Sequence, residues 1–159
     1  MIHKNLINFT SETRINPINA KVLIPKKTGI YFWFDKKLDE IVYIGVGAGS
    51  RGLYNRIVRQ HLNLNYIEYR PKRHAKKDFF QLKFPVKGTV KGEIQFGIDK
   101  SSFRKNIGRK LNLKPGEETL NYILDNLYIK YKEINNIKKL RKVEKQLIAK
   151  YKPMFNEKI

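Results

Sequence analysis

Four side chains whose types are suited to chemistry at a phosphate ester stand at separated positions: Tyr31, Tyr43, Arg56 and Glu144. A tyrosine hydroxyl can exchange a proton, and a guanidinium can bind a phosphate through two parallel hydrogen bonds. A carboxylate can hold a divalent cation. Such chemistry requires the four side chains to converge, so the elements around them must bring distant parts of the chain together.

The two tyrosines lie in a predicted β-hairpin. Large apolar residues occupy every second position of the strand 29–34, and Tyr31 and Trp33 share its opposite face. A polar loop leads to a second strand over 41–46, and a helix is predicted over 53–62. By itself, such a pair of aromatic-rich strands is ordinary strand composition.

Glu144 is an anomaly, because it lies on the apolar face of a helix predicted over 137–151. At about 100° per residue, the apolar residues of this helix span an arc of roughly 140°. They are Leu140, Val143, Leu147, Ile148 and Tyr151. The basic residues lie outside this arc or at its margin. Because an unpaired buried carboxylate is unfavourable, we expect a partner for Glu144, and an arginine, a metal ion and hydrogen-bond donors are all open alternatives.

Arg56 is a cationic counterpart on the first predicted helix. It lies about 60° from Leu53 around the helix axis, so its guanidinium could reach the hairpin face that carries Tyr31. An arginine there can stabilise the charge that develops on a phosphate. A surface phosphate contact and a plain ion pair are equally open.

Charge is the strongest bulk signal, since 34 basic and 14 acidic side chains give a net charge of +20. Such a surface favours polyanions, of which nucleic acid is the usual one. Residues 64–115 hold 14 of the basic and 4 of the acidic side chains, interleaved with aromatics, which suits phosphate contacts and base stacking. The alternative is a compositional lysine bias with aromatics in the core. The candidate nucleic-acid contacts are Arg70, Lys72, Arg73, Lys76, Lys77, Arg104 and Lys105.

The absence of cysteine excludes disulfides, thiolate metal sites and a cysteine nucleophile. No apolar run reaches ~18 residues, which predicts no membrane span. The N-terminus lacks the apolar core of a signal peptide. These features predict a cytoplasmic protein without a membrane partner.

The fold class predicted is α/β (α+β), with a small, mainly antiparallel central sheet flanked by helices in one domain over 1–159. Residues 1–20 are expected to form an arm and 64–115 a basic insertion. Further strands are expected at 21–25, 79–84, 93–98 and 127–134, and further helices at 101–111 and 117–126.

The segment Gly47–Gly52, GAGSRG, matches the glycine pattern of a dinucleotide-binding turn. Glu68 also stands about where a ribose-binding acid would lie. That fold requires successive parallel βαβ units, whereas the strand before the glycines is predicted to pair antiparallel with its neighbour. A flexible connection between strand and helix is therefore the favoured interpretation.

Taken together, four separated segments resemble the GIY-YIG endonuclease family. Gly29-Ile30-Tyr31 and Tyr43-Ile44-Gly45 match the two motifs that name it. Leu53–Arg56 is similar to the start of its first helix with the essential arginine, and Val143–Asn156 is similar to its C-terminal signature. The resemblance implies a GIY-YIG nuclease-like fold with the basic insertion in its middle third.

The resemblance also implies an activity and roles. The activity is metal-dependent hydrolysis of DNA phosphodiesters, double-stranded DNA first, with single strands and RNA not excluded. Glu144 would hold one Mg²⁺ (or Mn²⁺), one tyrosine would act as general base or its relay, Arg56 would neutralise developing charge, and Asn156 would brace the site. The alternative is a nucleic-acid-binding module that cleaves weakly or not at all.

One position departs from the family pattern, which often has His or Tyr four residues after the arginine. Here Gln60 stands at that position and His61 follows it. On an ideal α-helix His61 points about 140° away from Arg56. A catalytic role for His61 is therefore not expected unless the helix is distorted.

Overall fold

The structure is a computed structural model of the chain, and it describes residues 13–71, 81–82, 89–90, 93–114 and 116–157. The fold is mixed α/β. Its central sheet has the strand order β2-β1-β7, from β1 (Gly29–Asp35), β2 (Ile41–Gly47) and β7 (Leu127–Glu133). Both pairings in this sheet are antiparallel, as the sequence predicted.

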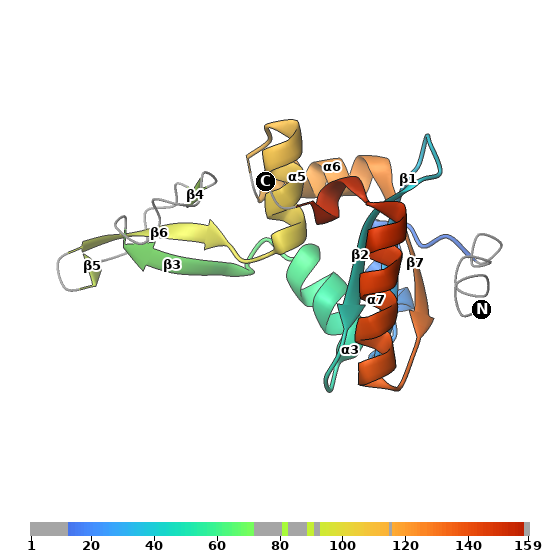
Figure 1. The fold of residues 1–159 in the computed structure, drawn as a ribbon. Coiled ribbons are helices and arrows are strands. Elements are labelled where there is room, and N and C mark those ends of the chain that lie inside the picture. The colour runs from blue at the N-terminus through green and yellow to red at the C-terminus, as the bar shows by residue number, and fades with distance from the viewer. Residues whose placement is uncertain (1–12, 72–80, 83–88, 91–92, 115, 158–159) are drawn as a thin grey trace.

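The two faces of the sheet bury different sets of side chains, which confirms the predicted alternation along β1. On one face lies α7 (Ile137–Tyr151) (Figure 1). Its apolar residues pack on Ile30, Phe32 and Phe34. The other face carries Tyr31 and Trp33. It is covered by helices that include α5 (Ser102–Leu111) and α6 (Glu117–Asn126).

The N-terminal arm and the strand predicted at 21–25 need correction where the structure describes them. Ile15 is buried and forms a backbone bridge with Ile129 of β7, so this stretch belongs to the core. A short 3-10 helix, η2 (Pro17–Asn19), leads into α2 (Ala20–Leu23). The Asn16 side chain accepts a hydrogen bond from the Ile18 N–H, and proline at a first helical position favours a helical start.

The glycine-rich segment 47–52 leads from β2 into a helix and not into a parallel βαβ unit. After Gly49, with φ of 96°, the chain enters α3 (Gly52–Tyr54) and continues into η3 (Asn55–His61). All strand pairs in the described ranges are antiparallel. The interpretation as a flexible connection therefore agrees with the structure, and the dinucleotide-binding interpretation does not.

The middle third forms a hairpin that extends away from the body of the molecule (Figure 1). It contains β3 (Ile67–Pro71), β4 (Gln81–Leu82), β5 (Thr89–Val90) and β6 (Glu93–Asp99). β6 pairs with each of the other three strands. Within the predicted insertion over 64–115, α5 places Phe103 and Ile107 in the main core. Within the described ranges, no helix is long and apolar enough to span a bilayer.

Candidate active site

Tyr31 and Tyr43 lie side by side on the same buried face of β1 and β2. Their ring centroids are 6.3 Å apart. Tyr31 is paired in register with Gly45, whereas Tyr43 is paired with Trp33. A Cβ atom at position 45 would overlap the hydroxyl and the ring of Tyr31. The glycine of the second tripeptide therefore makes the space in which the tyrosine of the first one lies.

Replacing Gly45 by alanine is expected to displace the Tyr31 ring and to lower the free energy of unfolding by about 1–3 kcal/mol. The added methyl group meets a fully buried side chain, so the clash cannot be relieved by moving it into solvent. Denaturant-induced unfolding measures the change. Val46→Ala, at the neighbouring half-buried position, is the control, and a Gly45→Ala protein as stable as wild type would contradict this packing.

His61 joins the two tyrosines, although the ideal helix geometry placed it elsewhere. Residues 55–61 form a π-helix, in which the Leu62 N–H bonds the Ile57 carbonyl, five residues back, at 3.0 Å. Residues five apart then lie one turn above each other, so Arg56 and His61 share a face. His61 Nε2 lies 2.6 Å from the Tyr31 hydroxyl. The expectation that His61 would point away was wrong because the helix is not an α-helix.

Burial sets the protonation states at this cluster. It lowers the pKa of His61 well below its ordinary value, and the charges of Arg56 and Arg104 lower it further. Burial raises the pKa of Tyr31 well above its ordinary value, more than the charge of Arg56 lowers it. Burial also raises the pKa of Tyr43. At neutral pH the histidine is therefore uncharged and both tyrosines keep their protons.

Arg56 is half-buried beside these groups, and one of its N–H groups forms no hydrogen bond within the described residues. Its Nη1 donates to Gln60 Oε1 at 2.9 Å. Gln60, which stands where GIY-YIG proteins often have His or Tyr, therefore orients the guanidinium. Its Nε is buried and has no hydrogen-bond partner among the described residues. Burial lowers the pKa of Arg56, but Tyr31 and Tyr43 more than offset this and leave that pKa raised. A buried, unsatisfied cationic donor is unfavourable unless an anion binds there.

Glu144 is half-buried on α7, and its charge adds to the effect of burial in raising the pKa of Tyr31 and of Tyr43. Burial raises the pKa of its carboxyl, and the charges of Arg56, Arg141 and Lys145 lower it. In the described part of the chain, no salt bridge or hydrogen bond reaches this carboxylate. A direct ion pair with arginine, one of the alternatives from the sequence, is therefore not what the described residues show.

The donor set around Glu144 restricts the metal it could hold. The described ranges contain no group of three histidine, aspartate or glutamate side chains that could together bind a metal ion. Mg²⁺ is commonly bound by one or two carboxylates, with water and substrate phosphate oxygens completing its shell. A lone carboxylate that no described side chain bonds fits this mode and does not fit a tetrahedral zinc site.

Asn156 braces the strand between the site residues. It ends η4 (Met154–Asn156), and its side-chain amide pairs with the backbone of Ile44 as a neighbouring strand would. Its Oδ1 accepts from the Ile44 N–H at 2.8 Å, and its Nδ2 donates to the Ile44 carbonyl at 2.8 Å. Ile44 lies between Tyr43 and Gly45, so the C-terminal segment fixes this part of β2.

The structure describes only some of the residues predicted to contact nucleic acid. Arg104 is a correction, because it is fully buried and paired with Asp99 and so does not face solvent. Lys105, next to it on α5, is partly exposed. Arg70 lies in β3, where only its backbone is described. The remaining four lie outside the described residues, namely Lys72, Arg73, Lys76 and Lys77.

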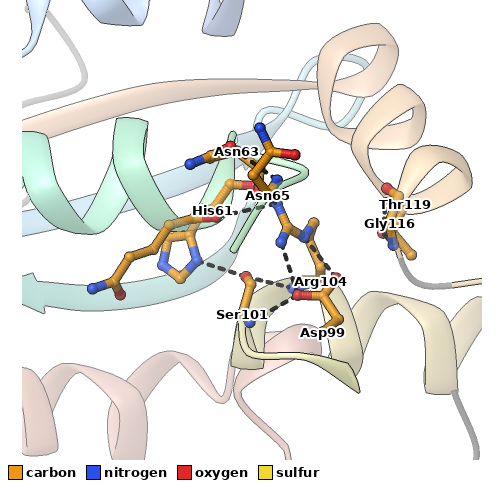
Figure 2. Close-up of polar contacts among 9 residues, drawn as sticks. His61, Asn63, Asn65, Asp99, Ser101, Arg104, Gly116 and Thr119 are labelled. Carbon is orange, nitrogen blue, oxygen red and sulfur yellow. Dashed lines mark hydrogen bonds and ion pairs between the residues drawn. The ribbon is translucent and has the colours of Figure 1, made fainter. Parts of the chain in front are cut away.

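The sequence analysis did not identify the residues of α5 and its N-cap that support the site. The Phe103 ring lies 4.4 Å from that of Tyr43 and 5.4 Å from that of His61. Ser101 Oγ lies 2.9 Å from His61 Nδ1 (Figure 2). One signal was available, since Arg104 shares a helix face with Ile107 and Leu111 at i, i+3 and i+7. A charge on an apolar face is the same anomaly that singled out Glu144.

Comparison of the chain with protein-family models, with curated proteins and with solved structures found no match in any of the three.

Proposed function

We propose that this chain is a metal-dependent endonuclease of the GIY-YIG type that hydrolyses phosphodiester bonds in DNA. The observation that carries the proposal is the pairing of Tyr31 and Tyr43, whose ring centroids lie 6.3 Å apart, with Arg56, whose charge lowers the pKa of both tyrosines and of Glu144 against the effect of burial. They come from β1, β2, η3 and α7, which are separate segments of the chain. The pairing of the two tripeptides across β1 and β2 also supports a GIY-YIG nuclease-like core.

Arg56 is the proposed ligand of the scissile phosphate. Its unsatisfied Nε would gain an acceptor from a phosphate oxygen, and its charge would stabilise the additional negative charge of the transition state. Gln60 holds the opposite side of the guanidinium, which reduces its freedom before the phosphate arrives. The arginine is therefore oriented in advance, which makes it more effective in the transition state.

Glu144 is the proposed ligand of one divalent cation, Mg²⁺ or Mn²⁺. When bound, such an ion would polarise the phosphoryl oxygens and stabilise the leaving alkoxide. The chain itself contributes the Glu144 carboxylate, which forms no hydrogen bond or salt bridge with the described side chains. Burial raises the pKa of this carboxyl overall, while the charges of Arg56, Arg141 and Lys145 lower it and so support the ionised form that binds a cation.

Tyr31 and His61 are the proposed route for the proton. With its raised pKa, Tyr31 is a poor base by itself, but it can accept a proton from water while its own proton passes to His61 Nε2 over 2.6 Å. The low pKa of His61 makes it a weak acceptor in the free protein. The negative charge of a bound phosphate would raise that pKa, so proton transfer is favoured only with substrate in place.

The outer face of α7 supports a polyanionic partner. Its exposed basic side chains are Lys138, Lys139, Arg141, Lys142, Lys145 and Lys150, and Glu144 is the only carboxylate in the helix. Like charges four residues apart destabilise a free helix by a few tenths of a kcal/mol per pair. Bound phosphates would remove this repulsion.

Removing the charges of Arg141 and Lys145 together, as Arg141→Gln with Lys145→Gln, is expected to weaken DNA binding in metal-free buffer. The slope of log K against log salt should become shallower by about 0.9 for each phosphate that the variant no longer neutralises. Fluorescence anisotropy over a salt series measures it. Lys36→Gln with Lys37→Gln removes the same charge from the β1–β2 loop as a control. An unchanged slope in the α7 variant would exclude this face from the interface.

Cleavage assays test the proposed activity. The wild-type protein, with Mg²⁺ or Mn²⁺, is incubated with supercoiled plasmid, linear duplex, single-stranded DNA and RNA. Nicking or cutting that stops with EDTA is the expected result. A nucleic-acid-binding module that does not cleave is the second candidate, favoured by the two protonated tyrosines. Tight binding without cutting under every metal and salt condition would select it.

A further inference from the structure

Arg104 and Asp99 form an ion pair that is completely buried between α5 and the base of the hairpin formed by β3–β6. Arg104 Nε donates to Asp99 Oδ2 at 2.7 Å, and Nη2 donates to Asp99 Oδ1 at 2.8 Å. Both residues have no exposed surface. Taking two charges out of water is unfavourable, and a buried pair by itself is weak evidence for stabilisation. What else the two residues bind therefore indicates what they do.

The remaining arm of the guanidinium binds the end of the π-helix. Arg104 Nη1 donates to the carbonyls of Gln60, His61 and Asn63 at 3.1, 3.0 and 2.7 Å (Figure 2). Carbonyls at the end of a helix lack donors from their own helix. The guanidinium supplies a donor to the His61 carbonyl and adds one to the Gln60 and Asn63 carbonyls, which also accept from backbone N–H groups. It therefore fixes the backbone of His61 and of the segment that leads to β3.

Ser101 extends the same network to the imidazole ring. Its N–H donates to Asp99 Oδ1 at 2.8 Å, and its Oγ accepts from the Arg104 N–H at 3.2 Å. The same Oγ lies 2.9 Å from His61 Nδ1. With Nδ1 held by Ser101, the opposite nitrogen, Nε2, faces the Tyr31 hydroxyl.

The network also joins the two ends of the hairpin. Asn63 precedes β3 and Asp99 is the last residue of β6, and one guanidinium binds both. The Lys100 N–H donates to the Tyr66 carbonyl at 3.1 Å beside them. Any tilt of the hairpin relative to the sheet must therefore change the contacts that hold His61.

We propose that Arg104 and Asp99 are positioning residues, which fix the backbone and, through Ser101, the ring of His61 toward Tyr31 and tie it to the base of the hairpin. The catalytic consequence rests on the proposed endonuclease function. The positioning itself does not, because it concerns contacts of the free protein. Arg104 and Asp99 touch neither tyrosine hydroxyl in these contacts, so they act through His61 and Ser101.

Nitrogen-15 NMR of the His61 ring tests the positioning without any substrate. Long-range proton–nitrogen spectra, assigned with His61→Gln, distinguish the two neutral tautomers from the charged ring. Tyr31, Tyr43, Arg56 and Arg104 all lie close to this ring or act on it electrostatically. The wild type is expected to show one neutral tautomer from about pH 5.5 to 8, below and above the ordinary histidine pKa.

Arg104→Lys keeps the positive charge but cannot donate two parallel hydrogen bonds to the Asp99 carboxylate. Asp99→Asn keeps the shape of the side chain but removes its negative charge. Both are expected to lose the single fixed tautomer, whereas Arg109→Lys on the same helix keeps it. Ser101→Ala removes only the ring contact and preserves the ion pair, so it should release the ring in a folded protein. A wild-type ring spectrum in Ser101→Ala, or in folded Arg104→Lys and Asp99→Asn, would overturn the proposal.

Cleavage kinetics give a separate readout. Arg104→Lys is expected to lower kcat on the order of a hundredfold with KM unchanged, because small displacements of a catalytic group have effects of that size. If wild type does not cleave, the proposed function fails while the NMR result still decides the positioning. Wild-type kcat in Arg104→Lys with a released ring would contradict the catalytic part alone.

Discussion

Glu144→Gln is expected to abolish Mg²⁺-dependent cleavage, by on the order of a thousandfold or more, while the protein remains folded. The metal and its charge contribute several kcal/mol to transition-state stabilisation, and about 4 kcal/mol corresponds to a thousandfold in rate. Glutamine has nearly the shape of glutamate but lacks the charge. Because no described side chain bonds the Glu144 carboxylate, its removal should leave no partner unsatisfied.

Plasmid cleavage rates across a Mg²⁺ titration measure this effect. Thermal unfolding verifies that the variant has the stability of wild type. Glu157→Gln, which removes an exposed carboxylate bound to Lys110, is the matched control and should cleave as wild type does. Cleavage by Glu144→Gln at the wild-type rate would remove Glu144 from the metal site.

Tyr31→Phe is expected to lower kcat by about 10²–10⁴-fold, the range that general acid–base catalysis contributes. The hydroxyl of Tyr31 bonds His61 Nε2 directly, whereas Tyr43 contacts His61 through its ring. The sequence left open which tyrosine handles the proton, and this geometry favours Tyr31. Tyr43→Phe should therefore have the smaller effect on kcat.

Single-turnover cleavage with both variants gives the comparison. Tyr31→Phe also leaves His61 Nε2 without its partner, which should lower the free energy of unfolding by about 1–3 kcal/mol. Rates are therefore measured well below the unfolding temperature of the variant. A larger reduction of kcat in Tyr43→Phe than in Tyr31→Phe would reverse the assignment of the two hydroxyls.

The antiparallel sheet and the faces that its side chains share could be predicted from local patterns. The alternation along β1 correctly separated Tyr31 from Ile30, because side chains in a strand point to opposite faces. The helical period placed Glu144 on a half-buried side of α7. Both predictions rest on one periodicity in one element, which is what a single sequence records best.

The position of His61 and the partners of buried Arg104 could not be predicted in this way. His61 reaches Tyr31 because one helix adopts the π-helical geometry, and no residue in the segment is specific to that geometry. Arg104 ends the same helix from a different part of the chain, through backbone carbonyls that carry no sequence signal. In both cases the deciding contacts are tertiary, so they override the local helix geometry.

The central claim is that Tyr31 and Glu144, from β1 and α7, act in one hydrolytic site, and a double-mutant comparison tests it most directly. Cleavage rates of wild type, Tyr31→Phe, Glu144→Gln and the double variant are measured with Mg²⁺ on the same plasmid. Residues that act as a unit have strongly non-additive effects. The double variant is therefore predicted to cleave little more slowly than the worse single variant. Rate reductions that multiply, or a wild-type protein that never cleaves, would contradict the claim.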